Sequence, residues 1–576
     1  MDKEKIILWK RRLLYFPRLF TRNEKILISL LLAAFLSSSL FLITSFILKN
    51  TIVTAASGGT YREGLIKQPR LVNPLYISNN DTDRDLISLI FSSLTRYDYK
   101  GEIIGDLAEK WEAKENNKVF IFYLNQNAKW HDGQKVTADD VIFTVKAVQN
   151  PEYKSPLRPN WQGVDSEKID NYTVRFSLKQ PYAAFFENAT LPIVPKHIWE
   201  NISPQNAVIS DFNLKPIGSG KYKFNNFETS RQNSIKSYTV RANKNYYKNP
   251  PHISTLQFSF YDAENELIEA LKKNDIDGLS SISARNKELL AKEEVVIYPL
   301  RLSRIFAVFL NSGKVENFRD QNVRQALSLA IPRNELIKNA LGGGAEESNS
   351  PLPSGAIKKK EKEEENKESN PEASLALLLK SGFKKTDAGI LVKKNVKNGK
   401  PGEAPFSIKL STSDIPELRG VAEFIKEKWE KTLGIKTEIN LMNITDLEKD
   451  AIRPRNYEAL LFGEVLGHEP DPFAFWHSSQ IRDPGLNIAM FSSSKTDKLL
   501  EDARREPDPE VRKKKYQEFE ALVNQNTGAI FLYTPHYFYA VSAFIKGVEL
   551  GNIVLPSDRF NEVEKWYIKT KRIWKN

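Results

Sequence analysis

One uninterrupted apolar run lies near the start of the chain, over residues 26–48, and contains no charged side chain. At about 1.5 Å per helical residue, a run of this length can cross a hydrocarbon core about 30 Å thick. Residues 1–25 carry eight Lys or Arg against three acidic residues, and the positive-inside rule therefore places the N-terminus in the cytoplasm. We predict a basic cytoplasmic tail at 1–25, a single-pass transmembrane anchor at 26–48 and a short tether at 49–56.

A cleaved signal peptide is the alternative interpretation, with Thr54, Ala55 and Ala56 as a small-residue cleavage site. The apolar core of a signal peptide is usually about 7–15 residues long, and the longer run favours an uncleaved anchor. Under either interpretation, residues 57–576 lie on the extracytoplasmic side, in the periplasm or outside the cell.

Beyond this run, two hydrophobic periodicities alternate along the chain. Alternating apolar positions predict strands at Val119–Leu124, residues 172–178 and residues 255–260. Apolar positions at helical spacing predict helices near residues 86–94, 267–271, 323–331 and 417–432. Strands interspersed with helices are typical of an α/β fold.

Length and composition limit the classes of protein to be considered. A chain of 576 residues with 41% hydrophobic and 11% aromatic content predicts two or three folded lobes. Cysteine is absent, which excludes disulfides, thiolate catalysis, Cys-based metal sites and a lipid-modified Cys anchor. The six histidines are scattered, so we expect no metal site.

The formal net charge of +12 raises the question of nucleic-acid binding. The first 25 residues account for +5, and the rest is spread without a basic stripe interleaved with aromatic residues. We therefore expect no nucleic-acid partner. The highly charged segment 358–370, within a predicted loop at 356–371, is interpreted as a solvated surface loop, with a docking element for a partner as the alternative.

The segment 106–141 contains the most informative pattern. It joins DLAEKWE, the strand VFIFYL and KWHDGQKVTADDV. Asp132 and Gly133 are typical of a turn, and Thr137 can cap a helix while Asp140 reaches back to the Thr137 amide. Trp130, His131 and Asp132 are therefore assigned to a strand–turn–helix joint rather than to a ligand.

This segment resembles family 5 of the bacterial extracellular solute-binding proteins, which serve dipeptide, oligopeptide and nickel ABC importers. Six further blocks continue the resemblance in the expected order: residues 216–224, 241–253, 318–333, 350–355, 377–383 and 469–480. Pro332 stands where the family usually has Asp. The resemblance extends from about residue 58 to the C-terminus.

The resemblance implies an α/β, bilobal, periplasmic-binding-protein-like fold of type II, in the peptide-binding subclass with an extra subdomain, preceded by one transmembrane helix. Lobe one is expected at 57–90, 214–298 and 535–576, its subdomain at 91–213 and lobe two at 299–534. A ligand cleft between such lobes closes by hinge motion.

The implied function is that of a membrane-tethered, monomeric substrate-binding component, which captures short peptides and delivers them to the permease and ATPase subunits of an ABC importer. No catalysis and no cofactor are expected, since the acidic pair Asp139 and Asp140 fits a helix start better than a glycosidase site. The alternatives are a nickel chelate or an oligosaccharide as the solute, or a ligand-binding sensor or scaffold.

Candidate ligand residues follow from the resemblance. In peptide-binding relatives an Asp near the turn after residues 459–462 receives the ligand's α-amino group, and a gap-free count gives His468 at that position. Glu464, Glu469 and Asp471 are nearby acids that could substitute, although Asp471 could simply cap a turn, and the candidate tryptophans could belong to the core. The predicted ligand contacts are Tyr76, Trp161, Gly463, Glu464, Glu469, Asp471, Trp476 and Asn487.

Overall fold

A computed structural model of the chain describes residues 20–77, 80–291, 293–353, 369–397, 400–468 and 471–575. The predicted charged loop 356–371 lies outside the described residues except for its last three, and the basic tail lies outside them up to residue 19. The chain divides into two compact units, the first made of Met1–Ser57 with Tyr567–Asn576 and the second of Gly58–Trp566.

The first unit contains the predicted anchor as helix α2 (Arg22–Asn50), which is the helix among the described residues that is long and apolar enough to cross a membrane. The helix begins where the Thr21 amide donates to Glu24 Oε2 at 2.8 Å. Residues 49–56, expected as a tether, include strand β1 (Thr51–Ala56), which pairs antiparallel with β23 (Lys569–Trp574). The lobe boundaries predicted from the sequence place β23 in lobe one.

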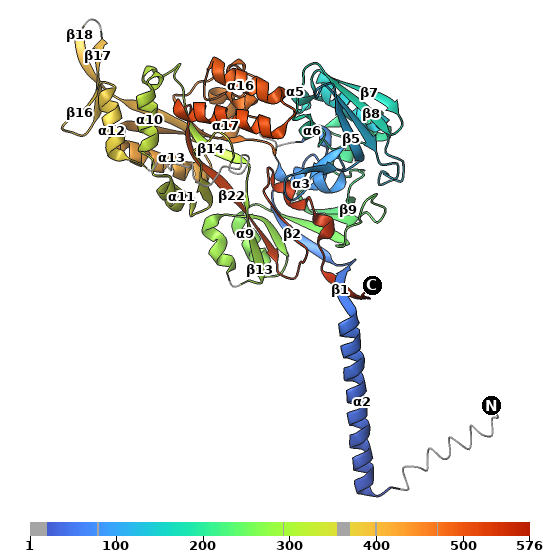
Figure 1. Cartoon of the computed structure of the whole chain (residues 1–576). Helices are drawn as coiled ribbons and strands as arrows, with labels where there is room; N and C mark the ends of the chain where they lie inside the picture. Colours follow the sequence, from blue (N-terminus) through green and yellow to red (C-terminus); the bar gives the residue numbers. More distant parts are fainter. Residues whose placement is uncertain are drawn as a thin grey trace. The chain divides into compact units, whose positions relative to one another are not determined.

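The second unit is organised around a large mixed sheet (Figure 1). Among the described residues it has twelve strands. Ten follow the order β20 (Lys436–Met442), β19 (Ser407–Ser413), β21 (Ala459–Val465), β14 (Arg304–Leu310), β22 (Ile530–Ser542), β12 (Gly278–Ile282), β2 (Thr60–Ile66), β11 (Thr255–Tyr261), β10 (Ile235–Ala242) and β9 (Tyr222–Thr229), and β13 (Val295–Arg301) and β15 (Ala345–Glu347) also pair with β22.

Three smaller sheets complete the described strands of this unit. They are β5 (Ala108–Lys114), β6 (Val119–Leu124), β8 (Thr173–Leu178) and β7 (Val164–Asp170); β16 (Phe383–Lys385), β17 (Leu391–Lys397) and β18 (Lys400–Pro405); and β3 (Thr95–Tyr97) with β4 (Ile103–Gly105). The predicted strands at 119–124, 172–178 and 255–260 are confirmed as β6, β8 and β11.

The longer helices of this unit lie between the strands in sequence, as an α/β fold requires. They are α3 (Asp81–Ile90), α4 (Ala138–Gln149), α9 (Glu264–Lys272), α10 (Gln321–Leu329), α11 (Arg333–Leu341), α12 (Pro371–Lys380), α13 (Pro416–Lys428), α16 (Ser494–Arg505) and α17 (Pro509–Gln525). The short helices are α5 (Arg158–Trp161), α6 (Phe185–Asn188), α7 (Lys196–Trp199), α8 (Pro204–Ala207), α14 (Ile444–Asp446) and α15 (Phe473–Trp476).

Strand β22 joins the two sides of the large sheet. On one side it pairs with β14, next to β21 and β19, all from predicted lobe two. On the other side it pairs with β12 and β13, which lead to β2 and β11 from predicted lobe one (Figure 1). The lobe boundaries stay a prediction, but the strand order separates the two sets of segments at β22.

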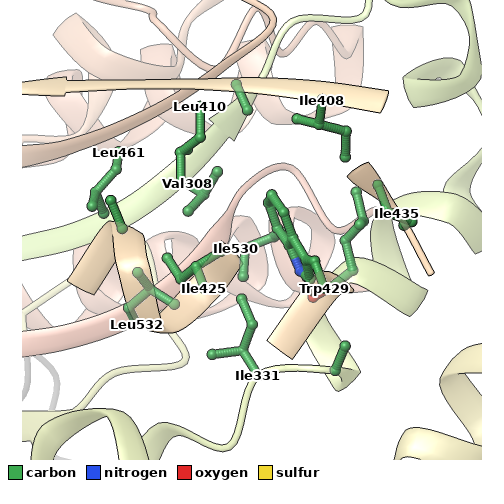
Figure 2. Close-up of a cluster of buried hydrophobic side chains, with 14 of the residues drawn as sticks. Val308, Ile331, Ile408, Leu410, Ile425, Trp429, Ile435, Leu461, Ile530 and Leu532 are labelled. Carbon is green, nitrogen blue, oxygen red and sulfur yellow. Dashed lines mark hydrogen bonds between the residues drawn. The ribbon is translucent and has the colours of Figure 1, made fainter. Parts of the chain in front are cut away.

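A hydrophobic cluster of predicted lobe two fixes α13 against the sheet. The Trp429 side chain is fully buried in this cluster and its indole N–H donates to the Leu327 carbonyl at 3.0 Å. Figure 2 shows this tryptophan among aliphatic side chains from the strands and from the helix. After α13 a π-helical turn ends before Gly434, whose φ is 76°, so the helical segment ends close to the end of the helix predicted at 417–432.

The predicted joint at 129–141 is also confirmed. The Thr137 amide donates to Asp140 Oδ2 at 2.8 Å and so starts α4. His131 connects this joint to the glycine-rich block 216–224, because its Nδ1 accepts from the Gly218 amide at 3.2 Å and its Nε2 lies 3.2 Å from the Gly220 carbonyl. Burial lowers the pKa of His131 to about 4, so the ring is neutral at pH 7.

Arg559 is a deeply buried charge, and its side chain has no exposed surface. Its Nη2 donates to Glu63 Oε1 on β2 at 2.7 Å, and its Nη1 donates to Asp85 Oδ1 on α3 at 2.8 Å. The Tyr539 hydroxyl on β22 donates to Glu63 Oε2 at 2.9 Å. One buried arginine therefore holds β2, α3, β22 and the turn Pro556–Phe560 together.

Replacing this arginine tests that role. We expect Arg559→Ala to lower the free energy of unfolding by about 3–5 kcal/mol, because it leaves two buried carboxylates without their cation. Urea denaturation of the full chain in detergent measures the loss. The matched control is Arg175→Ala, which removes an exposed pair with Glu167 and should cost no more than about 1 kcal/mol. Equal losses in the two variants would contradict the assignment.

Candidate functional site

A cavity of about 640 Å³ lies between residues 157–191 of the predicted subdomain and residues 465–504 of predicted lobe two. This volume is within the range of small-molecule sites, about 300–1,000 Å³. The lining of the cavity includes Trp161, Lys179, Tyr182, Phe185, Glu187, Asp471 and Arg504.

Two smaller cavities adjoin the first. One of about 210 Å³ shares Ile77 and Thr190 with it, and one of about 130 Å³ shares Gly467. Segments from both predicted lobes and from the subdomain therefore line neighbouring cavities near the end of β21. This is the location that the resemblance predicts for the ligand cleft.

One wall of the cavity carries an ion pair. Arg504 on α16 places its Nη2 2.6 Å from Asp471 Oδ2, and its guanidinium lies 3.9 Å from the centre of the Phe473 ring. The Tyr182 hydroxyl donates to Asp471 Oδ2 at 3.3 Å. Burial of Arg504 alone would lower its pKa, but the adjacent Asp471 outweighs burial and raises it. The Asp471 carboxylate is thus already neutralised by the protein.

The lining also carries Glu187 on α6. Its Oε1 accepts a hydrogen bond from the His468 amide at 3.1 Å. An added Cβ at Gly467 would lie 1.8 Å from this oxygen, so a larger residue there would displace the Glu187 carboxylate. Glu187 and Lys179 are the charged residues of the described lining outside the Asp471–Arg504 pair.

His468, the position of the relatives' α-amino contact, has its own partners. Its ring lies 3.9 Å from the Tyr97 ring of the subdomain, and its Nε2 lies 3.3 Å from Asp558 Oδ2 on the turn that also carries Arg559. The histidine therefore joins the subdomain, predicted lobe two and the C-terminal segment at the edge of the cavity.

The structure brings two of the predicted ligand residues to the cavity. Trp161 lines it and packs edge-on against Phe176 and Phe185, and Asp471 lines it as part of the ion pair. Tyr76 is buried, next to the lining residue Ile77, and its burial raises its pKa to about 12. Glu469 lies outside the described residues.

The other predicted residues lie inside lobe two, away from the described lining. Trp476 is fully buried against Phe491, Phe519 and Phe531. Asn487 is also fully buried, and its Nδ2 donates to the carbonyls of His477 and Phe491. Gly463 packs on the Phe306 ring, where an added Cβ would lie 2.8 Å from a ring carbon. Ligand contact by these three residues stays a prediction.

Glu464 is buried on the same strand, β21, with 3% of its surface exposed. Burial raises the pKa of this carboxyl to about 8, and the neighbouring Trp476 indole lowers it only in part. The group is therefore protonated in the folded protein at neutral pH. Its ligand contact also stays a prediction.

Sequence reasoning missed Tyr182, Glu187 and Arg504. Tyr182 and Glu187 contact residues 289 and 281 positions away, so no local pattern marks them. Arg504 ends a charged helix and resembles a solvated surface residue in sequence. Among the described residues, no group of three or more His, Cys, Asp or Glu could hold a metal ion.

Comparisons with known proteins find relatives over most of the chain. The family model for bacterial extracellular solute-binding proteins, family 5 middle region, matches residues 102–483. The oligopeptide-binding protein AppA of Bacillus subtilis is 27% identical over 89% of this chain and 92% of its own length. The dipeptide-binding protein of Escherichia coli is 23% identical over 77% of this chain and 83% of its own length.

Solved structures give the same result. AppA of Bacillus subtilis in complex with a nonapeptide superposes with a TM-score of 0.71 at 27% identity, covering 90% of this chain and all of AppA. NikZ of Campylobacter jejuni in complex with Ni(L-His) gives a TM-score of 0.71 at 25% identity, covering 88% and 99%. These likenesses confirm the predicted fold class.

The raised pKa of Glu464 has a consequence for stability. Since the folded protein keeps this proton up to about pH 8 and the unfolded chain releases it near 4.5, raising the pH between these values disfavours folding. We expect wild type to lose about 1.4 kcal/mol of stability per pH unit relative to Glu464→Gln across this window. Urea denaturation of both chains from pH 5 to pH 8 measures the difference.

The exposed Glu438 provides the matched control, because Glu438→Gln makes the same chemical change in solvent. Its stability should run parallel to that of wild type over the same pH range. A Glu464→Gln profile that also runs parallel to wild type would refute the buried, protonated state of Glu464.

Proposed function

Because the chain belongs to family 5 of the bacterial extracellular solute-binding proteins, we propose that it is the membrane-tethered substrate-binding component of an ABC importer, binding short peptides. It captures a peptide in the 640 Å³ cavity and delivers it to the permease and ATPase subunits as a monomer, without catalysis. The relatives named for oligopeptide and dipeptide binding support this choice of solute.

One observation supports a peptide most directly, namely the charge arrangement of the cavity wall. Beside the Asp471–Arg504 pair, the described lining carries one further acid, Glu187, and one further cation, Lys179. A peptide is a zwitterion, so Glu187 can receive its ammonium group and Lys179 its carboxylate by charge-assisted hydrogen bonds. Tyr182 contributes a partly exposed aromatic side chain to the lining, with the buried Trp161 and Phe185 behind it.

Among the acids considered from the sequence, we propose positioning rather than direct contact for Asp471. Its carboxylate holds Arg504 and Tyr182 in the wall, so its effect on a ligand passes through these two side chains. We propose Glu187, rather than an acid next to His468, as the carboxylate that contacts the ligand directly.

The strand pair of the first unit supports an uncleaved anchor. Cleavage after Ala56 would separate all of β1 from the protein and leave the six paired residues of β23 without their partner. A helix of 29 residues is about 44 Å long and spans a bilayer including part of its interfaces. We propose a cytoplasmic N-terminus and an extracytoplasmic main body.

A nickel complex is the second candidate solute. The likeness to NikZ, whose structure holds Ni(L-His), favours it. In a histidine chelate the amino nitrogen coordinates the metal, so the complex presents no ammonium group to Glu187. Peptide and chelate therefore differ in the groups that they present as well as in size.

The ligand is tested by thermal-shift screening of the full chain in detergent against di- to hexapeptides and Ni(L-His). A ligand at a hundred times its Kd adds about 2.7 kcal/mol of stability, enough to raise the Tm by degrees. We expect peptides to raise the Tm. A rise with the nickel complex alone would replace the peptide assignment, and no rise with either would contradict both.

For a peptide that binds, we expect Glu187→Gln to weaken binding by about 1.5–3 kcal/mol, because it removes a charge-assisted hydrogen bond. Calorimetric titration measures the change. The matched control is Glu167→Gln, which alters an exposed acid of the same subdomain outside the cavity lining and should leave Kd unchanged. N-acetylation of the peptide should weaken binding to wild type but weaken binding to Glu187→Gln little further. Equal losses from acetylation in both chains would exclude Glu187 as the anchor.

The anchor is tested by the mass and the location of the mature protein. We expect the purified chain to keep its N-terminal residues through β1 and to resist alkaline extraction from membranes, because α2 spans the bilayer. Loss of the residues before Ser57, seen by intact-mass spectrometry, would establish the signal-peptide alternative instead.

A further inference from the structure

This inference rests on the membrane anchor proposed above and concerns the ribbon formed by β1 and β23. We name residues 49–56 and 569–575 the juxtamembrane ribbon. We propose that this ribbon is a docking site for anionic phospholipid headgroups on the outer surface of the membrane that α2 crosses.

The ribbon is fixed to the last turn of α2. The Lys575 amide donates to the Asn50 carbonyl at 2.8 Å, and the Lys575 ammonium donates to the Lys49 carbonyl at 2.7 Å. The Trp574 ring lies 6.0 Å from the ring of Phe46, which belongs to the apolar run. The end of the chain therefore returns to the level at which α2 leaves the hydrocarbon core, where tryptophan is enriched in membrane proteins.

The ribbon exposes apolar side chains next to this level. Ile52 and Ile573 face each other across the strands and are 45% and 41% exposed, while Val53 and Trp574 are 56% and 59% exposed. A two-stranded ribbon alone in water is marginally stable at best. A bilayer interface would bury these four side chains and so stabilise the pairing of the strands.

The charge of the ribbon has one sign. Residues 49–57 and 567–575 contain five cationic side chains and no acidic one. Lys571 lies opposite Thr54 and Lys569 opposite Ala56, further from α2 than Ile573 and Trp574. Lys49 and Lys575 lie at the α2 end of the ribbon, so cations flank the apolar side chains on both sides. Cationic side chains next to apolar ones suit a leaflet of anionic lipid, where phosphates and acyl chains meet. An acidic protein partner would not need the apolar side chains.

The absence of cysteine from the chain allows a direct test. Ile573→Cys, labelled with a nitroxide in the otherwise intact full chain, reports the depth of the ribbon in nanodiscs of phosphatidylcholine alone or with phosphatidylglycerol. We expect the label to be shielded from a water-soluble relaxation agent in the anionic nanodiscs and more accessible in the zwitterionic ones. High salt should reduce the difference, since it screens charges at a surface.

Reversing three charges isolates the electrostatic contribution. In the labelled chain, Lys569→Glu, Lys571→Glu and Arg572→Glu together should weaken the surface association by roughly 100-fold or more and expose the label. A neutral variant, Lys569→Gln with Lys571→Gln, should give an intermediate exposure and guards against misfolding of the reversed one. The matched control, Lys223→Glu with Lys236→Glu, changes two exposed strand lysines of the second unit and should leave the label shielded.

Three outcomes would overturn the docking site. They are a label exposed in both lipids, a label shielded equally in both, and a label shielded only after a permease is added. Incorporation of the chain into nanodiscs is measured separately by co-elution, so failure of the anchor is distinguishable from failure of the ribbon. A chain that does not incorporate overturns the anchor and the docking site together.

Discussion

The buried guanidinium of Arg559 is the constraint on which the arrangement around the cavity depends. A cation without solvent contact must be neutralised where it lies, and Glu63 and Asp85 do so from β2 and α3. The same turn carries Asp558, whose carboxylate contacts His468 at the edge of the cavity. The pairing of Arg559 with Glu63 and Asp85 therefore fixes the position of the turn. The turn then fixes the contact of Asp558 with His468 of predicted lobe two.

The cavity lies where the protein's own side chains leave space between these segments unfilled. Segments nearly 300 residues apart in the sequence line the cavity. Some of their polar groups bond to one another, as the Tyr182 hydroxyl does to the Asp471 carboxylate. The described lining of the cavity carries charges of both signs, with Asp471 and Arg504 paired and with Glu187 and Lys179 as the further acid and the further base. In the proposed function, a zwitterionic solute is recognised by these charged groups rather than by a large number of exposed contacts, since exposed ion pairs contribute little.

The sequence allowed the local elements to be predicted, because their signals lie within a few residues. The alternation in Val119–Leu124, the Asp140 side chain that reaches back to Thr137 and the stop at Gly434 all have causes inside one segment. The site could be predicted only as far as the resemblance reached. Trp161 and Asp471 line the cavity, but Glu187 could not be identified, because its partner His468 is 281 positions away.

The same limit explains the first unit. Residues 51–56 are small or apolar and look like a tether when read alone, and they become a strand only through β23, more than 500 residues later. The second unit is consequently joined to the first at two positions, before Gly58 and after Trp566, where neighbouring paired strands carry the chain. The pairing of β1 with β23 brings the two connections together as neighbouring strands of one ribbon within the first unit. A local reading of residues 51–56 cannot reveal this arrangement, because the pairing strand follows more than 500 residues later.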